Sequence, residues 1–262
     1  METLSLDALL GLAAALAVGG LVTGFLAGLF GIGGGGILVP ILFEVFRFAG
    51  VDEAIRMHMA VGTALATMIP TTISSFLSHR RRGNVDIEII KRLAIPVVIG
   101  VVIGSLIAKA SHSIVLTLVW IVFAGLMASK QFAGSAHWRL GSDIPRSRLL
   151  EVYGAAVGIV STLMSIGGGA FITTMMTLYG RTIQQAVGTS SGFGPVIALP
   201  GMIGFMWAGW GVEGTPFGSF GYVSLIGAAA MIPLGVLAAP IGVRVASGIS
   251  RRALEIAFGI FL

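Results

Sequence analysis

The residues that carry the most chemical information are glycines, which occur in two matching copies of one motif. The first copy ends in the triplet Gly33–Gly35 and the second in Gly167–Gly169, at an offset of 134 residues. Each triplet follows an apolar stretch, and adjacent glycines each weaken a helix by about 1 kcal/mol. Each triplet is therefore predicted to interrupt a helix and to leave a stretch of backbone that no side chain covers. In membrane proteins such paired interruptions in corresponding halves point to a transport site.

A helix that begins directly after such a triplet presents free backbone N–H groups and the positive end of its dipole. We expect one helix to begin after Gly36 and another after Gly169. One terminus stabilises an anion by about 0.3–1 kcal/mol, and by up to ~2 kcal/mol when partly buried. Two termini with added hydroxyl donors predict a site for a small oxyanion that needs no arginine. The residues assigned to it are Gly33, Gly34, Gly35, Thr63, Ser165, Gly167, Gly168, Gly169, Thr189 and Ser190.

Glycines and hydroxyls also have structural explanations. Spaced glycines, such as Gly20 with Gly24 and Gly154 with Gly158, are typical packing seams between membrane helices. Serine and threonine hydroxyls often bond to their own helix. The first copy also matches a dinucleotide fingerprint, but no strand precedes it and the second copy lacks the last glycine. Nucleotide binding is therefore excluded.

Titratable side chains are rare in the apolar segments. His58 lies just before the Ala60–Thr63 element, at the repeat position that Gln184 fills in the second half. A histidine titrates near neutral pH, so His58 is a candidate for coupling proton movement to transport. The alternative is a polar residue at a helix start that faces headgroups or a carbonyl. Carboxylates are missing from the predicted middle of the membrane, so we expect no metal site and no cofactor.

The composition is that of a membrane protein. Hydrophobic residues make up 56% of the 262 residues, charged residues 10%, and the mean hydropathy is +0.99. A soluble domain has about a quarter charged residues. The net charge of +5 comes from arginines between apolar segments, so no nucleic-acid partner is predicted. The absence of cysteine excludes disulfides and thiolate metal sites.

Apolar runs and their breakers predict an all-α membrane protein with about ten transmembrane segments, as two repeats of five. The first five segments cover residues 8–30, 37–48, 57–77, 89–110 and 113–130, and the second five cover 149–164, 170–180, 184–207, 217–243 and 249–262. The expected division is a first repeat over 1–130, a linker over 131–148 and a second repeat over 149–262.

The short segments 37–48 and 170–180 cover about half of a 30 Å hydrocarbon core. Each helix pair is therefore expected to enter part-way and turn on its glycines. An odd number of spans per repeat predicts inverted copies, whose turns would meet near the midplane. With the N-terminus outside, thirteen Lys and Arg residues fall inside and three outside, so the linker is expected in the cytoplasm.

The offset between the repeats changes along the chain. Ala60–Thr63 matches Ala186–Thr189 at an offset of 126, which predicts about eight extra residues in the first half near residues 46–57. Gly100 matches Gly235 at 135, which predicts a similar insertion in the second half near 207–217.

Together these elements resemble the sulfite exporter TauE/SafE family of bacterial permeases. The resemblance rests on the Gly-x-Gly-Gly-Gly turn after the first segment, Ala60–Thr63, the Gly-Asn-Val-Asp loop Gly83–Asp86, and the second-half counterparts Ser165–Gly169 and Ala186–Thr189. It covers nearly the whole chain. It implies a secondary transporter of the bacterial inner membrane for sulfur-containing anions such as sulfite and sulfoacetate, with several members acting in export.

The chain departs from internal symmetry where Gly36 and Pro40 become Ala170 and Thr174, which predicts unequal half-sites. The expected function is export of sulfite or organosulfonate anions by alternating access. The alternatives are a transporter of another small anion such as a carboxylate, one of a neutral metabolite, and a non-transporting membrane scaffold. No Ser–Lys pair, paired histidines or acidic dyad indicates an enzyme. Transport direction, coupling ion and oligomeric state stay open.

Overall fold

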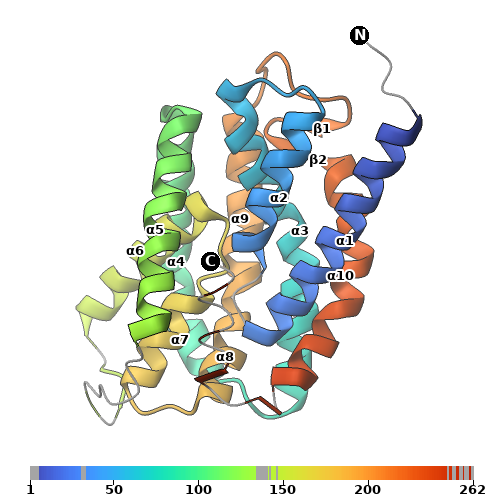
Figure 1. The fold of residues 1–262 in the computed structure, drawn as a ribbon. Coiled ribbons are helices and arrows are strands. Elements are labelled where there is room, and N and C mark those ends of the chain that lie inside the picture. Colours follow the sequence, from blue (N-terminus) through green and yellow to red (C-terminus); the bar gives the residue numbers. More distant parts are fainter. Residues whose placement is uncertain are drawn as a thin grey trace.

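The computed structural model describes residues 6–30, 34–133, 141, 143–145, 147–246, 248–249, 252–253, 256 and 260. These residues form a bundle of helices with one two-stranded hairpin (Figure 1). The first half contains α1 (Leu6–Phe30), α2 (Gly35–Phe48), α3 (Glu53–Arg81), α4 (Ile87–Ala110) and α5 (Ser113–Ala133). The second half contains α6 (Arg148–Met164), α7 (Gly169–Leu178), α8 (Ile183–Ser191), α9 (Phe193–Ala208), β1 (Ser219–Phe220), β2 (Val223–Ser224) and α10 (Leu225–Ala246).

Several helices have the length and composition of membrane spans. Within the described residues, α3, α4, the α8–α9 run and α10 are each long and apolar enough to cross a bilayer. Large apolar side chains lie exposed on outer faces, such as Ile95, Ile99 and Val102 on α4. An all-α membrane protein is therefore confirmed, whereas the number of ten spans stays a prediction.

The centre of the bundle is α3. Every residue from Met57 to Met68 is buried, because α3 contacts α2, α9 and α10 at once. A helix that is covered on all sides suits a buried position in a membrane bundle. At its start the Asp52 carboxylate accepts a hydrogen bond from the Ala54 N–H at 2.8 Å, which caps the first turn.

Glycines hold the two halves together at close range. On α1, Gly24 lies against the backbone of Gly235 in α10, and on α6, Gly158 lies against the Val97 carbonyl of α4. A Cβ atom at either glycine would collide with that backbone. The predicted packing seams are therefore confirmed, and they join α1 to α10 and α6 to α4, so each pairs the first helix of one half with a helix of the other half.

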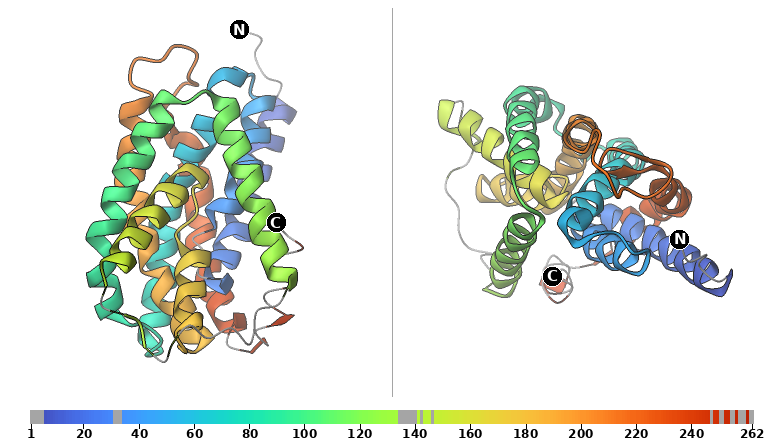
Figure 2. Two further views of the ribbon diagram at one scale, coloured as in Figure 1. Left: turned by 90° about the vertical axis from the view of Figure 1, so that its left-hand side faces the viewer. Right: turned by 90° about the horizontal axis from the view of Figure 1, so that it is seen from above.

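The contacts along both seams define the helix directions. Along each seam, residue numbers rise in the same direction on both helices, so α1 is parallel to α10 and α6 is parallel to α4. The contacting pairs are Gly20 with Met231, Gly24 with Gly235, Gly28 with Ala239, Gly154 with Leu93, and Gly158 with Val97. In Figure 1, α1 runs downward and α2 returns upward, whereas α6 runs upward and α7 returns downward (Figure 2). The first helix pairs of the two halves thus have opposite directions.

The lengths of the helices locate the extra residues of each half. Helix α2 has 14 residues and α7 has 10. Similarly, α3 begins at Glu53, seven residues before Ala60, whereas α8 begins at Ile183, three residues before Ala186. The eight extra residues of the first half are therefore one added helical turn at the end of α2 and one at the start of α3.

The second half differs from the predicted segments at two places. The predicted segment 217–243 begins later, at Leu225, because Ser219–Phe220 pairs with Val223–Ser224 in a hairpin. The connection 209–224 between α9 and α10, which holds this hairpin, is longer than the connection 82–86 between α3 and α4, and the predicted place of the insertion, 207–217, overlaps its first part. The predicted segment 184–207 is divided at Gly192 into α8 and α9.

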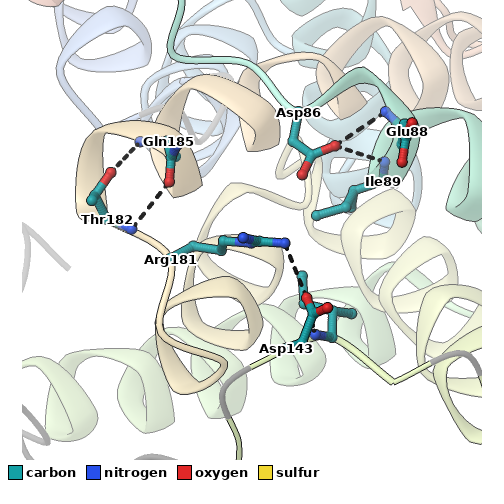
Figure 3. Close-up of polar contacts among 8 residues, drawn as sticks. Asp86, Glu88, Ile89, Asp143, Arg181, Thr182 and Gln185 are labelled. Carbon is teal, nitrogen blue, oxygen red and sulfur yellow. Dashed lines mark hydrogen bonds and ion pairs between the residues drawn. The ribbon is translucent and has the colours of Figure 1, made fainter.

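Polar contacts fix the ends of the helices. Glu44 and Arg47 near the end of α2 form an ion pair at 2.7 Å. Asp86 caps α4, and Thr182 with Gln185 forms a capping box at the start of α8 (Figure 3). An exposed ion pair at 3.0 Å joins Arg181 to Asp143 in the segment before α6 (Figure 3).

The seam between α4 and α6 predicts a cost for any side chain at Gly158. We expect Gly158→Val to lower the stability of the purified protein in detergent by about 1–3 kcal/mol, because the new methyl groups collide with the Val97 carbonyl. The matched control is Gly125→Val on α5, where a Cβ has no neighbour within 4 Å. Thermal unfolding followed by size-exclusion chromatography measures both, and equal midpoints would contradict the role of this seam.

Candidate functional site

The two glycine turns have the same backbone conformation. Gly34 precedes α2 with φ 73°, and Gly168 precedes α7 with φ 69°. Side chains rarely adopt this left-handed region, which explains the glycine at each position. No side chain caps either helix, so the earliest N–H groups of each helix lack a side-chain acceptor. In α2 the Ile37 N–H already donates to the Gly34 carbonyl at 3.1 Å.

The two turns touch each other. Gly35, the first residue of α2, lies so close to Ser165 that a Cβ would collide with its carbonyl oxygen. The Ile166 side chain lies beside Gly36. A Cβ atom added at Gly36 would lie 3.4 Å from it, which is ordinary van der Waals contact. The structure thus brings together residues that are about half a chain apart in the sequence. Whether the contact lies at the membrane midplane stays a prediction.

Ser165 has the features of a ligand-binding residue. It ends α6 with φ 53°, which makes it the one described non-glycine residue with a positive φ. Its side chain is fully buried, and its hydroxyl has no hydrogen-bond partner. Buried polar groups without partners are rare, and backbone strain of this kind concentrates at functional sites.

Two further unpartnered donors lie close to this turn. The Ser161 hydroxyl, one helical turn before Ser165, is buried and has no partner. The indole N–H of Trp120 on α5 is also buried without an acceptor, and its ring packs against the cluster of Met164 and Ile166. Trp120 escaped the sequence analysis because no motif or repeat marks it. These unpartnered donors favour a ligand that accepts hydrogen bonds.

The turns are covered unequally. Gly34 faces the Thr23 carbonyl of α1, whereas Gly168 faces the Ile197 side chain of α9 and Val157 of α6. One turn therefore has a polar backbone neighbour and the other has apolar neighbours. The unequal half-sites expected from the change of Gly36 to Ala170 stay a prediction.

Thr63 and Thr189 use their hydroxyls for structure. The Thr63 hydroxyl accepts a hydrogen bond from the Ser224 N–H at 2.9 Å, and the Thr189 hydroxyl accepts one from the Asp86 N–H at 2.8 Å. Thr63 in α3 is thereby tied to the residue before α10, and Thr189 in α8 to the residue before α4. The sequence analysis assigned both residues to substrate binding. Because each hydroxyl oxygen accepts a backbone hydrogen bond, only the hydroxyl hydrogens are left to bind a substrate.

The other assigned residues are distributed as follows. Gly167 and Gly169 lie in and directly after the second turn, and Gly33 is outside the described residues. The Ser190 hydroxyl donates to the Val187 carbonyl at 2.9 Å and accepts from the Thr173 hydroxyl at 3.1 Å. Ser190 is therefore held in a local network, whereas Ser165 is not.

His58 is fixed by its neighbours. Its Nε2 donates to the Ala108 carbonyl of α4 at 3.0 Å, and its ring lies 4.8 Å from the Tyr222 ring of the hairpin. Burial raises the pKa of the Tyr222 phenol, so this neighbour carries no charge. The contacts match the alternative role foreseen for His58, a helix-start residue bonded to a carbonyl. Its role in coupling stays a prediction.

Metal-ligating residues do not gather in the described part of the chain. No group of three His, Cys, Asp or Glu side chains there could hold a metal ion. The groups at the glycine turns that can donate hydrogen bonds are hydroxyls, an indole and backbone amides, and such donors suit an anion.

Comparison with known proteins assigns the family. The family model of the sulfite exporter TauE/SafE matches residues 16–262. The chain belongs to the TauE/SafE family. The predicted family is thus confirmed over nearly the whole chain, and with it the class of membrane transporter.

Relatives of this TauE/SafE protein carry transporter names. A probable membrane transporter protein of Haemophilus influenzae is 32% identical over 249 residues, which cover 93% of this chain and 92% of the relative. A probable membrane transporter protein of Methanocaldococcus jannaschii is 28% identical over 246 residues, which cover 92% and 89%. No solved structure matches the chain.

The loop contacts of Thr63 and Thr189 predict a stability effect. Thr63→Val and Thr189→Val should each lower stability by about 1–3 kcal/mol, because each leaves a buried or half-buried backbone N–H without its acceptor. The matched variants Thr63→Ser and Thr189→Ser keep the hydroxyl and should stay near the wild type. Denaturant unfolding in detergent compares the four variants. Valine variants as stable as the serine variants would refute this structural role.

Proposed function

We propose that this TauE/SafE-family transporter moves sulfite or organosulfonate anions across the bacterial inner membrane, and that the anion binds where the two glycine turns meet. The observation that carries the proposal is the contact between Gly35 and Ser165. It places an uncapped helix start beside a buried hydroxyl that has no partner. The name of the family supplies the class of anion and the direction of export.

The electrostatics of the turns favour negative charge. Helices α2 and α7 leave their turns in opposite directions (Figure 1), so their positive dipole ends converge on the same region. A partly buried terminus contributes up to ~2 kcal/mol toward an anion. Two termini can therefore hold a singly charged anion without a basic side chain.

The donors around the turns suit an oxyanion. Ser161, Ser165 and Trp120 each offer an unused hydrogen, and hydrogen bonds to charged groups are worth about 1.5–3 kcal/mol. A sulfonate or sulfite group presents three oxygens, so it can accept bonds from several donors at once. A cation would find no carboxylate in this set of residues.

The proposed architecture is the inverted repeat of five segments per half, with boundaries at residues 130 and 148. It is supported by the opposite directions of α1 and α6 and by the matched seams between the halves. Basic residues support an outside N-terminus and a cytoplasmic linker. In Figure 1 the end of α3, the start of α4 and the end of α10 lie at one end of the bundle. In the sequence, Arg80–Arg82, Lys91, Arg92 and Arg244 belong to those helix ends, whereas Arg47, Arg56 and Lys109 belong to the end of α2, the start of α3 and the end of α4.

Alternating access then consists of a movement of the two halves around the anion. Glycine seams suit this movement, because contacts between backbones without interlocking side chains can slide. The loop bonds of Thr63 and Thr189 join the halves near opposite ends of the bundle, so each can open while the other holds.

Transport is tested by the flux of labelled sulfite and sulfoacetate into proteoliposomes that contain the purified protein. Saturable flux that excess sulfonate blocks is the expected result. Flux that small carboxylates block and sulfonates do not would replace the substrate class with carboxylates. No flux of any of these anions by folded protein would overturn the proposal and favour a scaffold.

The position of the site is tested by two matched pairs of variants. Gly35→Ala should abolish flux because its methyl group collides with the Ser165 carbonyl, whereas Gly36→Ala should keep most of it. Ser165→Ala should weaken the apparent affinity at least about tenfold, because the anion loses one hydrogen bond. Its control is Ser191→Ala, since the Ser191 hydroxyl already bonds to the Gly188 carbonyl at 2.6 Å. Equal effects within either pair would place the site elsewhere.

A further inference from the structure

A ridge of polar side chains follows α3 through the core of the protein. Its members repeat every fourth residue and are all buried: Thr63, Thr67, Thr71, Ser75 and His79. The three threonines have partners, since Thr67 donates to the Thr63 carbonyl at 3.0 Å and Thr71 to the Thr67 carbonyl at 3.1 Å. Ser75 and His79 differ, because neither the serine hydroxyl nor either ring nitrogen has a hydrogen-bond partner.

His79 is in a different situation from His58. His79 is 4% exposed, neither ring nitrogen has a hydrogen-bond partner, and Gly28 of α1 is its backbone neighbour. His58, in contrast, has its Nε2 engaged by the Ala108 carbonyl. A buried imidazole that has no fixed partner can take up a ligand without first breaking a bond.

The position of His79 relates it to the first glycine turn. Gly34 faces Ala27 of α1, because a Cβ at Gly34 would lie 3.4 Å from the Ala27 Cβ. The next residue of α1, Gly28, is the one beside the His79 ring. The proposed anion site and His79 therefore lie against the same turn of α1.

The charged side chains that follow His79 in the chain are basic, so a bound anion would supply the opposite charge. They are Arg80, Arg81 and Arg82, and a further arginine, Arg244, lies in the last turn of α10. Near this end α1 and α8 carry no ionisable side chain, since Asp7 is at the other end of α1. The closest carboxylate in sequence is Asp86, which caps α4.

We propose that His79 and Ser75 form a proton-binding site that is filled when the transported anion binds, so that anion and proton cross the membrane together. The inference rests on the proposed function. A proton from water binds to one ring nitrogen, the imidazole becomes an imidazolium, and the proton returns to water when the anion leaves. The Ser75 hydroxyl accepts a hydrogen bond from the charged ring.

The size of the coupling follows from Coulomb's law. Two opposite unit charges about 10 Å apart, in a medium of effective dielectric constant ~20, change each other's binding equilibrium about tenfold or more. By linkage, the proton strengthens anion binding by the same factor. A tenfold change corresponds to uptake of about half a proton per bound anion at the pH where uptake is largest.

The experiment measures proton uptake when sulfoacetate is added to the full-length protein in weakly buffered detergent solution, with binding measured in parallel by calorimetry. Sulfoacetate is the probe because its charge is constant between about pH 6 and 8, unlike that of sulfite. The chain has four histidines, so the triple variant H58Q/H112Q/H137Q keeps His79 alone. This variant should take up about half a proton or more at its maximum, as the wild type should.

Adding His79→Gln to the triple variant should abolish the uptake while sulfoacetate still binds, about tenfold more weakly. Uptake that persists without His79, or that is lost in the triple variant, would overturn the proposal. Binding without uptake by the wild type would refute proton coupling and leave the proposed function intact. Absence of sulfoacetate binding by the wild type would instead refute the proposed function, and this inference with it.

Discussion

The structure depends on close backbone contact between helices that belong to different halves of the chain. Helix α1 packs on α10 and α4 packs on α6 through glycines that leave room for a neighbouring carbonyl. Small residues permit such contacts in a bilayer, where burial of apolar side chains supplies little driving force between helices. Because each seam joins the first helix of one half to a helix of the other half, neither half can complete its packing alone.

The same interlocking explains how the glycine turns come together. Each turn ends a first helix, so the seams that hold α1 and α6 also hold the turns, and Gly35 meets Ser165. At this contact Ser165 keeps an unfavourable left-handed backbone conformation, and the buried hydroxyls of Ser161 and Ser165 have no hydrogen-bond partner, which also costs free energy. Such costs persist at functional sites because the ligand or the transport cycle uses them. The two turns are covered unequally, since Gly34 faces a carbonyl and Gly168 faces apolar side chains.

Residues with a strong local effect could be predicted from the sequence. The glycine triplets predicted helices that begin after Gly36 and after Gly169, within two residues of the observed starts at Gly35 and Gly169. The spaced glycines predicted the seams, because glycine acts through its own backbone. Hydroxyl roles could not be predicted, since the partner of Thr63 is Ser224, which is distant in the sequence. Trp120 and His79 had no local signal either. What distinguishes them is a missing hydrogen bond, which is a property of their surroundings.

The sequence by itself determined that this is a helical membrane protein with duplicated glycine turns, and its motifs identified the TauE/SafE family. Composition, apolar run length and glycine spacing suffice for that, because the bilayer and the backbone impose the same rules on every chain. Only the tertiary structure decided which hydroxyls are occupied, which donors are free and that the two turns touch. These outcomes depend on the cross-packing of the halves, since a hydrogen bond requires a partner within about 3 Å whatever the distance along the chain.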